Sequence, residues 1–497
     1  MTHLLTFIRS SWFFYGALFF FVISSVWIAA ASLYPMAFDE EFHYGLIKIY
    51  ATSLLPYGIE HTSDMAQFGS ATADASYLFH YLMSFPYRLF YAFGAPDMAI
   101  IIALRFINIA FVAVALVVFN KALRSANVSS AITHLSLLLV TFIPIFPLLA
   151  AHINYDNLLL LVFAWSVLCI VRITNVVRAG KPLPLGQSVQ LAVAVLIGMS
   201  VKYAFLPLAL AMFIWLLWLL ALGYKIHKQT ISTQLQSWRT HWKLQGRRKR
   251  YLMSGLVIVS LFFASHYVTN MLSYGSPIPS CERVFSEKEC AAYGPWNRNK
   301  NMEARKSESF APMSYPAYMT TEWFPGMTQR LMFAVAGKTN DFQTKLPLPI
   351  LVYSFVALSV LGVTCMIIQL VRKKSSWLMA FTMLLAVLYA GILSFQLYGD
   401  YVDTANPVAI NGRYLIPVLP LVAAVLIQSI SALVGFIDRR IVSALAIASI
   451  VYLLLAGAGA ATYIVLAESH WFWPGFGQDS HAALKAFFDQ VIFPQRY

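Results

Sequence analysis

The chain has 497 residues, of which 59% are hydrophobic and only 11% are charged. Soluble proteins carry about 25% charged residues, so this composition excludes a soluble globule, which would lack the polar surface that it needs. The formal net charge of +14 does not indicate a nucleic-acid partner, because cationic loops of membrane proteins commonly reflect their topology.

Many apolar stretches reach the roughly 18 residues needed to cross the hydrocarbon core of a bilayer. The first is too long for the apolar core of a cleavable signal peptide, so we expect it to remain as a span. The fifth and sixth share one apolar run that breaks near Lys202, and they form either two crossings or a re-entrant pair. We predict about eleven helical spans, over residues 12–34, 98–119, 131–149, 156–172, 187–200, 203–223, 251–270, 347–371, 376–398, 414–434 and 441–467.

The distribution of basic residues predicts the orientation of these spans. With the N-terminus inside, the inner segments are much shorter in total than the outer ones, yet they hold more than half of the 35 lysines and arginines. Of the 21 acidic residues, only Asp438 falls inside. Because Lys and Arg concentrate in cytoplasmic loops, the pattern predicts a cytoplasmic N-terminus and an outer C-terminus.

We therefore expect an all-α polytopic membrane protein with a single transmembrane domain, residues 1–497. Three outer segments are long: 35–97, 271–346 and 468–497. In the first, 41–56 has an apolar side and a polar side, which predicts a helix lying in the interface. The aromatic-rich segment 76–94 is also expected at the outer surface.

The chain has four cysteines. Cys169 and Cys365 fall within predicted spans and are expected to act as small apolar side chains. Cys281 and Cys290 lie in the large outer segment, where an oxidising compartment would allow a disulfide between them.

Three consecutive carboxylates, residues 39–41, follow the first span directly. In a helix, Asp39 and His43 are spaced i,i+4 and share a face. A carboxylate at the mouth of a helix bundle can act as a general base towards a hydroxyl, or it can hold a divalent cation such as Mg²⁺ or Mn²⁺. The alternative is a solvated cluster that ends a span.

The outer turn between the third and fourth spans reads HINYDN, with Asp156 opening a helix that runs inward. Asp156 can cap that helix and complement its dipole. It can also be a second carboxylate facing Asp39 from the same side of the membrane.

Three cations lie in or beside predicted spans. Arg413 begins the tenth span, where its guanidinium suits phosphate binding or snorkels to lipid headgroups. Arg105 lies about two turns, roughly 10 Å, inside the second span, where a charge requires a partner or a cavity. Lys202 is either another phosphate contact or only a loop charge.

Three motifs together resemble the GT-C superfamily, membrane glycosyltransferases that use polyprenyl-phosphate sugars. They are Asp39-Glu40 with His43 after the first span, Asn154-Tyr155-Asp156 after the third, and Gly412-Arg413-Tyr414 with Pro417 before a late span. Each motif is short, but their order and the topology run along most of the chain. The resemblance looks closest to a bacterial branch of the superfamily.

The resemblance implies inverting transfer of a sugar from a polyprenyl-phosphate donor to a glycan, lipid or protein acceptor, at the outer face of a bacterial inner membrane. It makes Asp39 the catalytic carboxylate. We group Glu40 and Asp156 with it, and we assign substrate binding to His43, Arg105, Lys202, Arg413 and Tyr414. We expect Arg413 to touch the leaving phosphate and Arg105 to orient a carboxylate such as Asp39 or Asp156.

The donor class also follows from the sequence itself. No P-loop or dinucleotide fingerprint is present, and the carboxylates are expected to face outward, away from cytoplasmic nucleotide sugars. The rival hypotheses are a flippase or transporter of a lipid-linked glycan, which would need similar charges, and a glycan polymerase. Transporters often contain internal repeats and broken helices, whereas this sequence shows one break, at Lys202, and no repeat.

Overall fold

A computed structural model describes residues 2–36, 39–57, 59, 62–227, 230–244, 246–332, 334–336, 343–345, 349–433, 448–453 and 458–492. Over this part of the chain the protein is built from helices, apart from one antiparallel pair of short strands, β1 Ala334–Ala336 and β2 Gln343–Lys345. The predicted all-α fold is therefore confirmed for the described residues, apart from this strand pair.

Seven of the described helices are long and apolar enough to cross a membrane. They are α2 Ser11–Ala31, α5 Asp97–Ser125, α8 Tyr155–Arg178, α10 Leu206–His227, α12 Gly246–Tyr274, α18 Pro349–Val371 and α19 Trp377–Thr404. Three shorter apolar helices correspond to further predicted spans: α6 Ser130–Thr141, α9 Leu185–Val201 and α20 Leu419–Leu433. Residues 441–447 and 454–457 of the predicted eleventh span, 441–467, lie outside the described residues, which include α22 Ala460–Leu466 at its end.

Two predicted spans differ from the helices observed. The third is divided into α6 and the short helix α7 Ile145–Ala150, with Pro144 immediately before α7. Proline removes a backbone donor and interrupts the helical hydrogen bonds, which accounts for the break. The tenth begins at Leu419, later than expected, because residues 412–415 form a separate 3₁₀ turn, η4 Gly412–Leu415.

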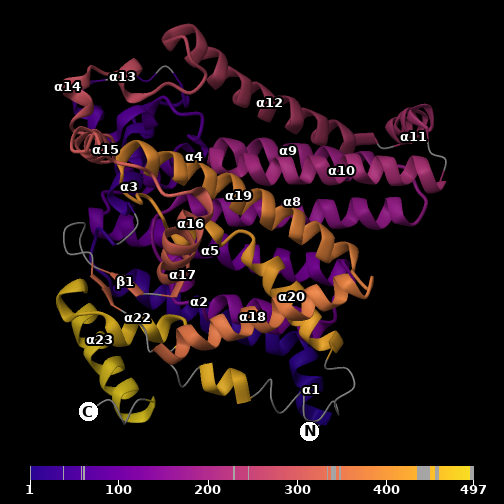
Figure 1. Cartoon of the computed structure of the whole chain (residues 1–497). Coiled ribbons are helices and arrows are strands. Elements are labelled where there is room, and N and C mark those ends of the chain that lie inside the picture. The colour runs from indigo at the N-terminus through magenta and orange to yellow at the C-terminus, as the bar shows by residue number, and fades with distance from the viewer. Residues whose placement is uncertain are drawn as a thin grey trace.

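The long helices lie side by side, and the connecting segments gather at the two ends of this bundle (Figure 1). One end carries α3 Glu40–Tyr50, α13 Cys281–Val284, α14 Glu287–Cys290 and α23 Phe476–Phe487. The opposite end carries α1 Thr2–Arg9 and α11 Ile231–Leu244. The segments predicted to lie outside are thus grouped at one end of the bundle, which we call the loop end.

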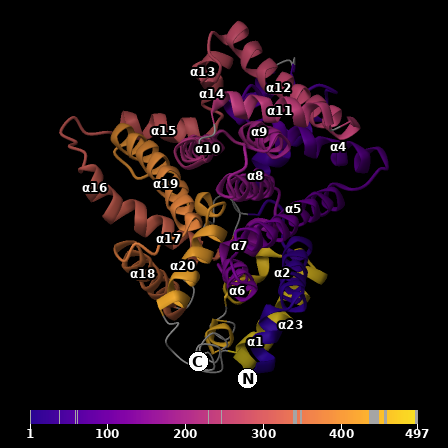
Figure 2. The same ribbon diagram turned by 90° about the vertical axis from the view of Figure 1, so that its right-hand side faces the viewer.

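Helices α5 and α8 pack extensively against each other near the middle of the bundle. In the view of Figure 2, α18, α19 and α20 lie on one side of this pair, and α2, α6 and α23 lie on another. Buried apolar side chains from these helices form one continuous core. The pair α5 and α8 matters for the site because both helices begin at the loop end.

The first outer segment forms helices that lie along the loop end. In α3, Leu46, Ile49 and Tyr50 are buried, whereas Glu41 and Lys48 are exposed. The helix ends at Tyr50, so Leu54 of the predicted apolar side lies beyond it and is exposed. The segment continues through a 3₁₀ helix, η1 Ser63–Thr72, into α4 Leu78–Ala92, which packs against α3.

The second outer segment adds α13, α14, α15 Gly294–Ala304, α16 Tyr315–Tyr318, a π-helical turn η3 Met319–Trp323 and α17 Phe324–Met332. A disulfide joins Cys281 to Cys290, and both cysteines are buried against Ala66 of η1. Ser63 donates a hydrogen bond to Glu289 at 2.8 Å. The two outer segments are therefore fastened to each other.

The C-terminal segment packs on the end of α2. It comprises α22, a 3₁₀ turn η6 Ser469–Trp471, α23 and a π-helical turn η7 Phe488–Ile492. The Leu33 amide donates to the Trp471 carbonyl at 2.8 Å, and the Trp473 amide donates to the Ala31 carbonyl at 2.9 Å. These bonds fix the chain just before Asp39.

Candidate functional site

Asp39 stands at the head of α3 in an unusual backbone conformation. Its φ of 64° and ψ of 27° lie in the left-handed region, which non-glycine residues seldom occupy and which costs free energy. Its side chain is 59% exposed. A strained backbone conformation persists only where the surrounding structure enforces it. The contacts of the next residue, Glu40, enforce it here.

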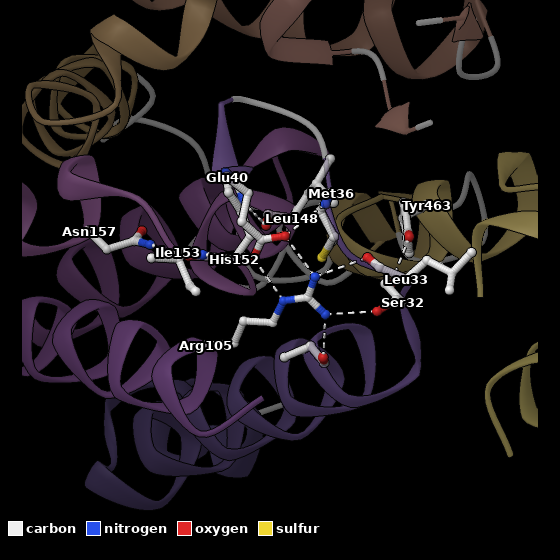
Figure 3. A network of polar contacts seen from close by, with 11 residues as sticks. Ser32, Leu33, Met36, Glu40, Arg105, Leu148, His152, Ile153, Asn157 and Tyr463 are labelled. Atoms are coloured by element: carbon white, nitrogen blue, oxygen red, sulfur yellow. Dashed lines mark hydrogen bonds and ion pairs between the residues drawn. The ribbon is translucent and has the colours of Figure 1, made fainter. Parts of the chain in front are cut away.

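Glu40 and Arg105 form a fully buried ion pair (Figure 3). Arg105 Nε donates to Glu40 Oε1 at 2.8 Å, and Arg105 Nη2 donates to Oε2 at 2.7 Å. The side-chain exposure of both residues is 0%. The two parallel hydrogen bonds of this fork are the strong geometry for an arginine and a carboxylate.

The remaining donors of Arg105 hold the chain that leads from α2 to α3. They reach the carbonyl oxygens of Ala29, Ser32 and Leu33 at 2.7 to 3.0 Å. A guanidinium has five N–H donors, and these contacts together with Glu40 satisfy all of them. Arg105 therefore ties the end of α2 to the start of α3, and this fixes the backbone on which Asp39 stands.

The Glu40 carboxylate also accepts hydrogen bonds from two backbone amides, Met36 at 2.7 Å and Ile153 at 3.1 Å. Burial alone would raise the pKa of Glu40, but the Arg105 charge and hydrogen bonds hold it below its ordinary value. Glu40 is thus an anchored anion without solvent access. The sequence groups it with Asp39 as a catalytic carboxylate, and the structure separates the two: Glu40 positions Asp39.

Asp156 lies in the first turn of α8, and the structure does not use it as the helix cap. Asn154 caps α8, because its side chain accepts a hydrogen bond from the Asp156 amide at 2.9 Å. The buried Asp156 carboxylate instead accepts a hydrogen bond from Lys202 Nζ at 2.7 Å. Lys202 ends α9 and is itself buried, so it is not a solvated loop charge.

Arg413 connects Asp39 to Asp156. Its Nη2 donates to Asp39 Oδ2 at 2.9 Å, and its Nε lies 3.8 Å from Asp156 Oδ2. Arg413 is buried. Burial alone would lower its pKa, but the neighbouring Tyr414 and Asp39 hold the pKa above its ordinary value. The ring of Tyr414 lies 4.7 Å from Lys202 Nζ and 5.4 Å from Arg413 Cζ, within cation–π distance of both.

His43 lies inside the loop end, not on the exposed side of α3 beside the Asp39 carboxylate. Its Nδ1 is 2.9 Å from Nε2 of His80, and its ring packs edge-on against Tyr155 with centroids 4.5 Å apart. Burial lowers the pKa of His43 well below its ordinary value, with a further contribution from His80. Burial likewise lowers the pKa of His80 to about 3 and that of His152 to about 4. These imidazoles are therefore neutral at physiological pH.

The structure brings the residues selected from the sequence together at the loop end, in two layers. Asp39, Asp156, Lys202, Arg413 and Tyr414 form a charged cluster, which we call the outer cluster. Glu40 and Arg105 form the anchor on which it rests. We expected Arg105 to orient a carboxylate such as Asp39 or Asp156; the carboxylate that it holds is Glu40.

Sequence reasoning missed Asn108, a buried polar residue of α5 one turn after Arg105. Its side-chain oxygen accepts hydrogen bonds from the Asn154 amide at 3.3 Å and from Asn157 Nδ2 at 3.1 Å. It therefore fixes the turn that presents Asp156. The sequence did contain an indication of this role, because Asn108 is a polar side chain three residues after Arg105 within an apolar span.

The outer cluster combines one exposed carboxylate with buried cations and a second carboxylate. Within the described residues, no group of three His, Cys, Asp or Glu side chains is arranged to hold a metal ion. Here Asp39 and Asp156 are neutralised by Arg413 and Lys202. An exposed carboxylate held in one orientation can accept a proton from a bound hydroxyl.

In comparisons with known proteins, the chain matches no protein-family model and no curated protein.

Proposed function

We propose that this protein is an inverting glycosyltransferase that moves a sugar from a polyprenyl-phosphate donor to an acceptor hydroxyl, with Asp39 as the general base. One observation carries the proposal. The strained, exposed Asp39 is held by Arg413 and stands on the buried Glu40–Arg105 anchor. Strain and buried charge both cost stability, and their concentration around one reachable carboxylate is typical of a catalytic group.

In the proposed reaction, Asp39 accepts the proton of the acceptor hydroxyl as that oxygen attacks the anomeric carbon. The new carbon–oxygen bond forms while the bond between the anomeric carbon and the phosphate oxygen breaks. The bonding electron pair leaves with polyprenyl phosphate, and cations near the site stabilise its charge. Asp39 then releases its proton to solvent. A single displacement inverts the anomeric centre.

The lipid-linked donor is supported by the membrane architecture. Seven helices of the described residues are long and apolar enough to cross a membrane. The outer cluster joins residues at the starts of α3 and α8 and in η4, and the phosphate of a membrane lipid would reach it there. We propose that eleven segments cross the membrane, as the apolar stretches of the sequence predict. We also propose that the membrane is a bacterial inner membrane, with the N-terminus in the cytoplasm and the loop end outside, as the basic loops predict.

Replacing the proposed base tests this function. We expect Asp39→Asn to abolish sugar transfer from a polyprenyl-phosphate donor while leaving the thermal unfolding temperature close to wild type, because the exposed amide keeps the shape of the side chain. Asp64→Asn is the matched control, since Asp64 is an exposed acid of the same outer segment. Transfer is measured on the purified full chain as release of polyprenyl phosphate. A folded Asp39→Asn variant with near-normal turnover would remove Asp39 from the role of base.

A further inference from the structure

Arg330 of α17 lies beside the outer cluster, in the large outer segment that sequence reasoning left without a role. The packing of α17 against η4 positions it. Leu331 and Met332, the next two residues, are buried, whereas Arg330 is exposed. Gly412 permits the contact, because a Cβ at this position would lie 2.3 Å from the Met327 carbonyl and 2.8 Å from the Leu331 amide nitrogen. Arg330 and Arg413 are therefore neighbours across this backbone contact.

The two arginines have different electrostatic surroundings. Arg413 is buried between Asp39 and Asp156. Among the described residues, no carboxylate forms an ion pair with Arg330. The pKa of Arg330 lies below its ordinary value. Partial burial is the main cause and the Arg413 charge adds to it, whereas Tyr414 acts in the opposite direction. The Arg413 charge is near enough to disfavour a second positive charge at Arg330. Because no carboxylate of the described residues pairs with Arg330, a bound anion beside it would be favourable.

We propose that Arg330 binds the phosphate group of the polyprenyl-phosphate donor, while Arg413 remains engaged with Asp39 and positions the base. This inference rests on the proposed function. It assigns the phosphate to Arg330, whereas the sequence led us to expect that Arg413 touches it. A phosphate monoanion or phosphodiester matches the forked donors of an exposed guanidinium. Arg330 would hold the leaving group close to the exposed Asp39 carboxylate and offset the charge that develops on it.

Binding of polyprenyl phosphate to the purified full chain in nanodiscs tests the assignment. Loss of a charge-assisted hydrogen-bonded contact should weaken the affinity of Arg330→Ala about 10- to 100-fold. Arg330→Lys keeps the charge but loses the fork, so we expect a smaller loss. Arg305→Ala, an exposed arginine of the same outer segment, should bind like wild type. Polyprenol, which lacks the phosphate, should not distinguish the variants.

Two further probes separate the sources of the phosphate. If inorganic phosphate displaces polyprenyl phosphate from the wild-type chain but not from Arg330→Ala, the assignment is supported. If phosphatidylglycerol displaces polyprenyl phosphate as well as unlabelled polyprenyl phosphate does, Arg330 is a general lipid-headgroup contact and the assignment is overturned. Wild-type affinity in Arg330→Ala overturns it too, while leaving the proposed function intact. If the wild-type chain binds no polyprenyl phosphate, the proposed function fails, and the assignment fails with it.

The kinetics give a second readout, which a purely structural role of Arg330 would not produce. Arg330→Ala should raise the KM for the donor at least as strongly as it lowers kcat. Arg413→Ala should chiefly lower kcat, because it releases Asp39. The opposite pattern in two well-folded variants would reverse the roles and overturn the assignment.

Discussion

Two adjacent carboxylates, Asp39 and Glu40, have opposite environments. Asp39 in the left-handed conformation keeps its carboxylate exposed, whereas Glu40 begins α3 and points its carboxylate into Arg105. The sequence showed that Arg105 needs a partner, but it did not show which of the neighbouring acids would provide it. That choice depends on one backbone angle and on the path of residues 29–33, neither of which the apolar pattern specifies.

The anchor makes a prediction about coupling between its two members. Glu40→Gln should destabilise the protein by about 3 to 5 kcal/mol, because it leaves the buried Arg105 charge uncompensated. Arg105→Gln should have a similar effect, because it leaves the buried Glu40 charge uncompensated. The double variant should lose much less than the sum of the two, since it strands no charge. The free energy of unfolding in detergent micelles measures this, with exposed Glu303→Gln as control. Additive losses would show that the two side chains do not act as a pair.

At the scale of elements, the site depends on short turns that join the apolar helices. The helices could be predicted because their apolar runs are long enough to cross a membrane. The turns could not, since η4 and the break before α7 arise from local packing and proline positions within stretches that are apolar throughout. For the same reason Arg330 resembled any other loop arginine until the contact between α17 and η4 placed it beside Arg413.

The contact between α17 and η4 predicts a large effect from a very small substitution. Gly412→Ala places a methyl group against backbone atoms of Met327 and Leu331, so η4 must move and Arg413 with it. We expect a lower unfolding temperature and at least a tenfold loss of sugar transfer, about 1.4 kcal/mol in the activation free energy. Gly391→Ala in α19 is the control, since a Cβ there meets no atom within 4 Å. Equal activity of the two variants would show that the close approach does not position Arg413.

For the whole molecule, the architecture places polar chemistry at one end of an apolar bundle. The long outer segments and basic inner loops of the sequence predicted this arrangement, and in the structure the selected residues contact one another at the loop end. Polar pairs inside the bundle, such as Asn108 with Asn157, were not predicted, because isolated amides in apolar spans carry no information about their partners.

The most direct test of the central claim uses the purified chain in sealed proteoliposomes, with a polyprenyl-phosphate sugar, a panel of hydroxyl acceptors and no ion gradient. Mass spectrometry of the lipid and glycan products should show polyprenyl phosphate and a glycosylated acceptor in equal amounts. Both products should disappear with Asp39→Asn and persist with Asp64→Asn. Transbilayer movement of the intact lipid-linked sugar, with no cleavage of the bond between sugar and phosphate, would contradict glycosyl transfer and identify a transporter.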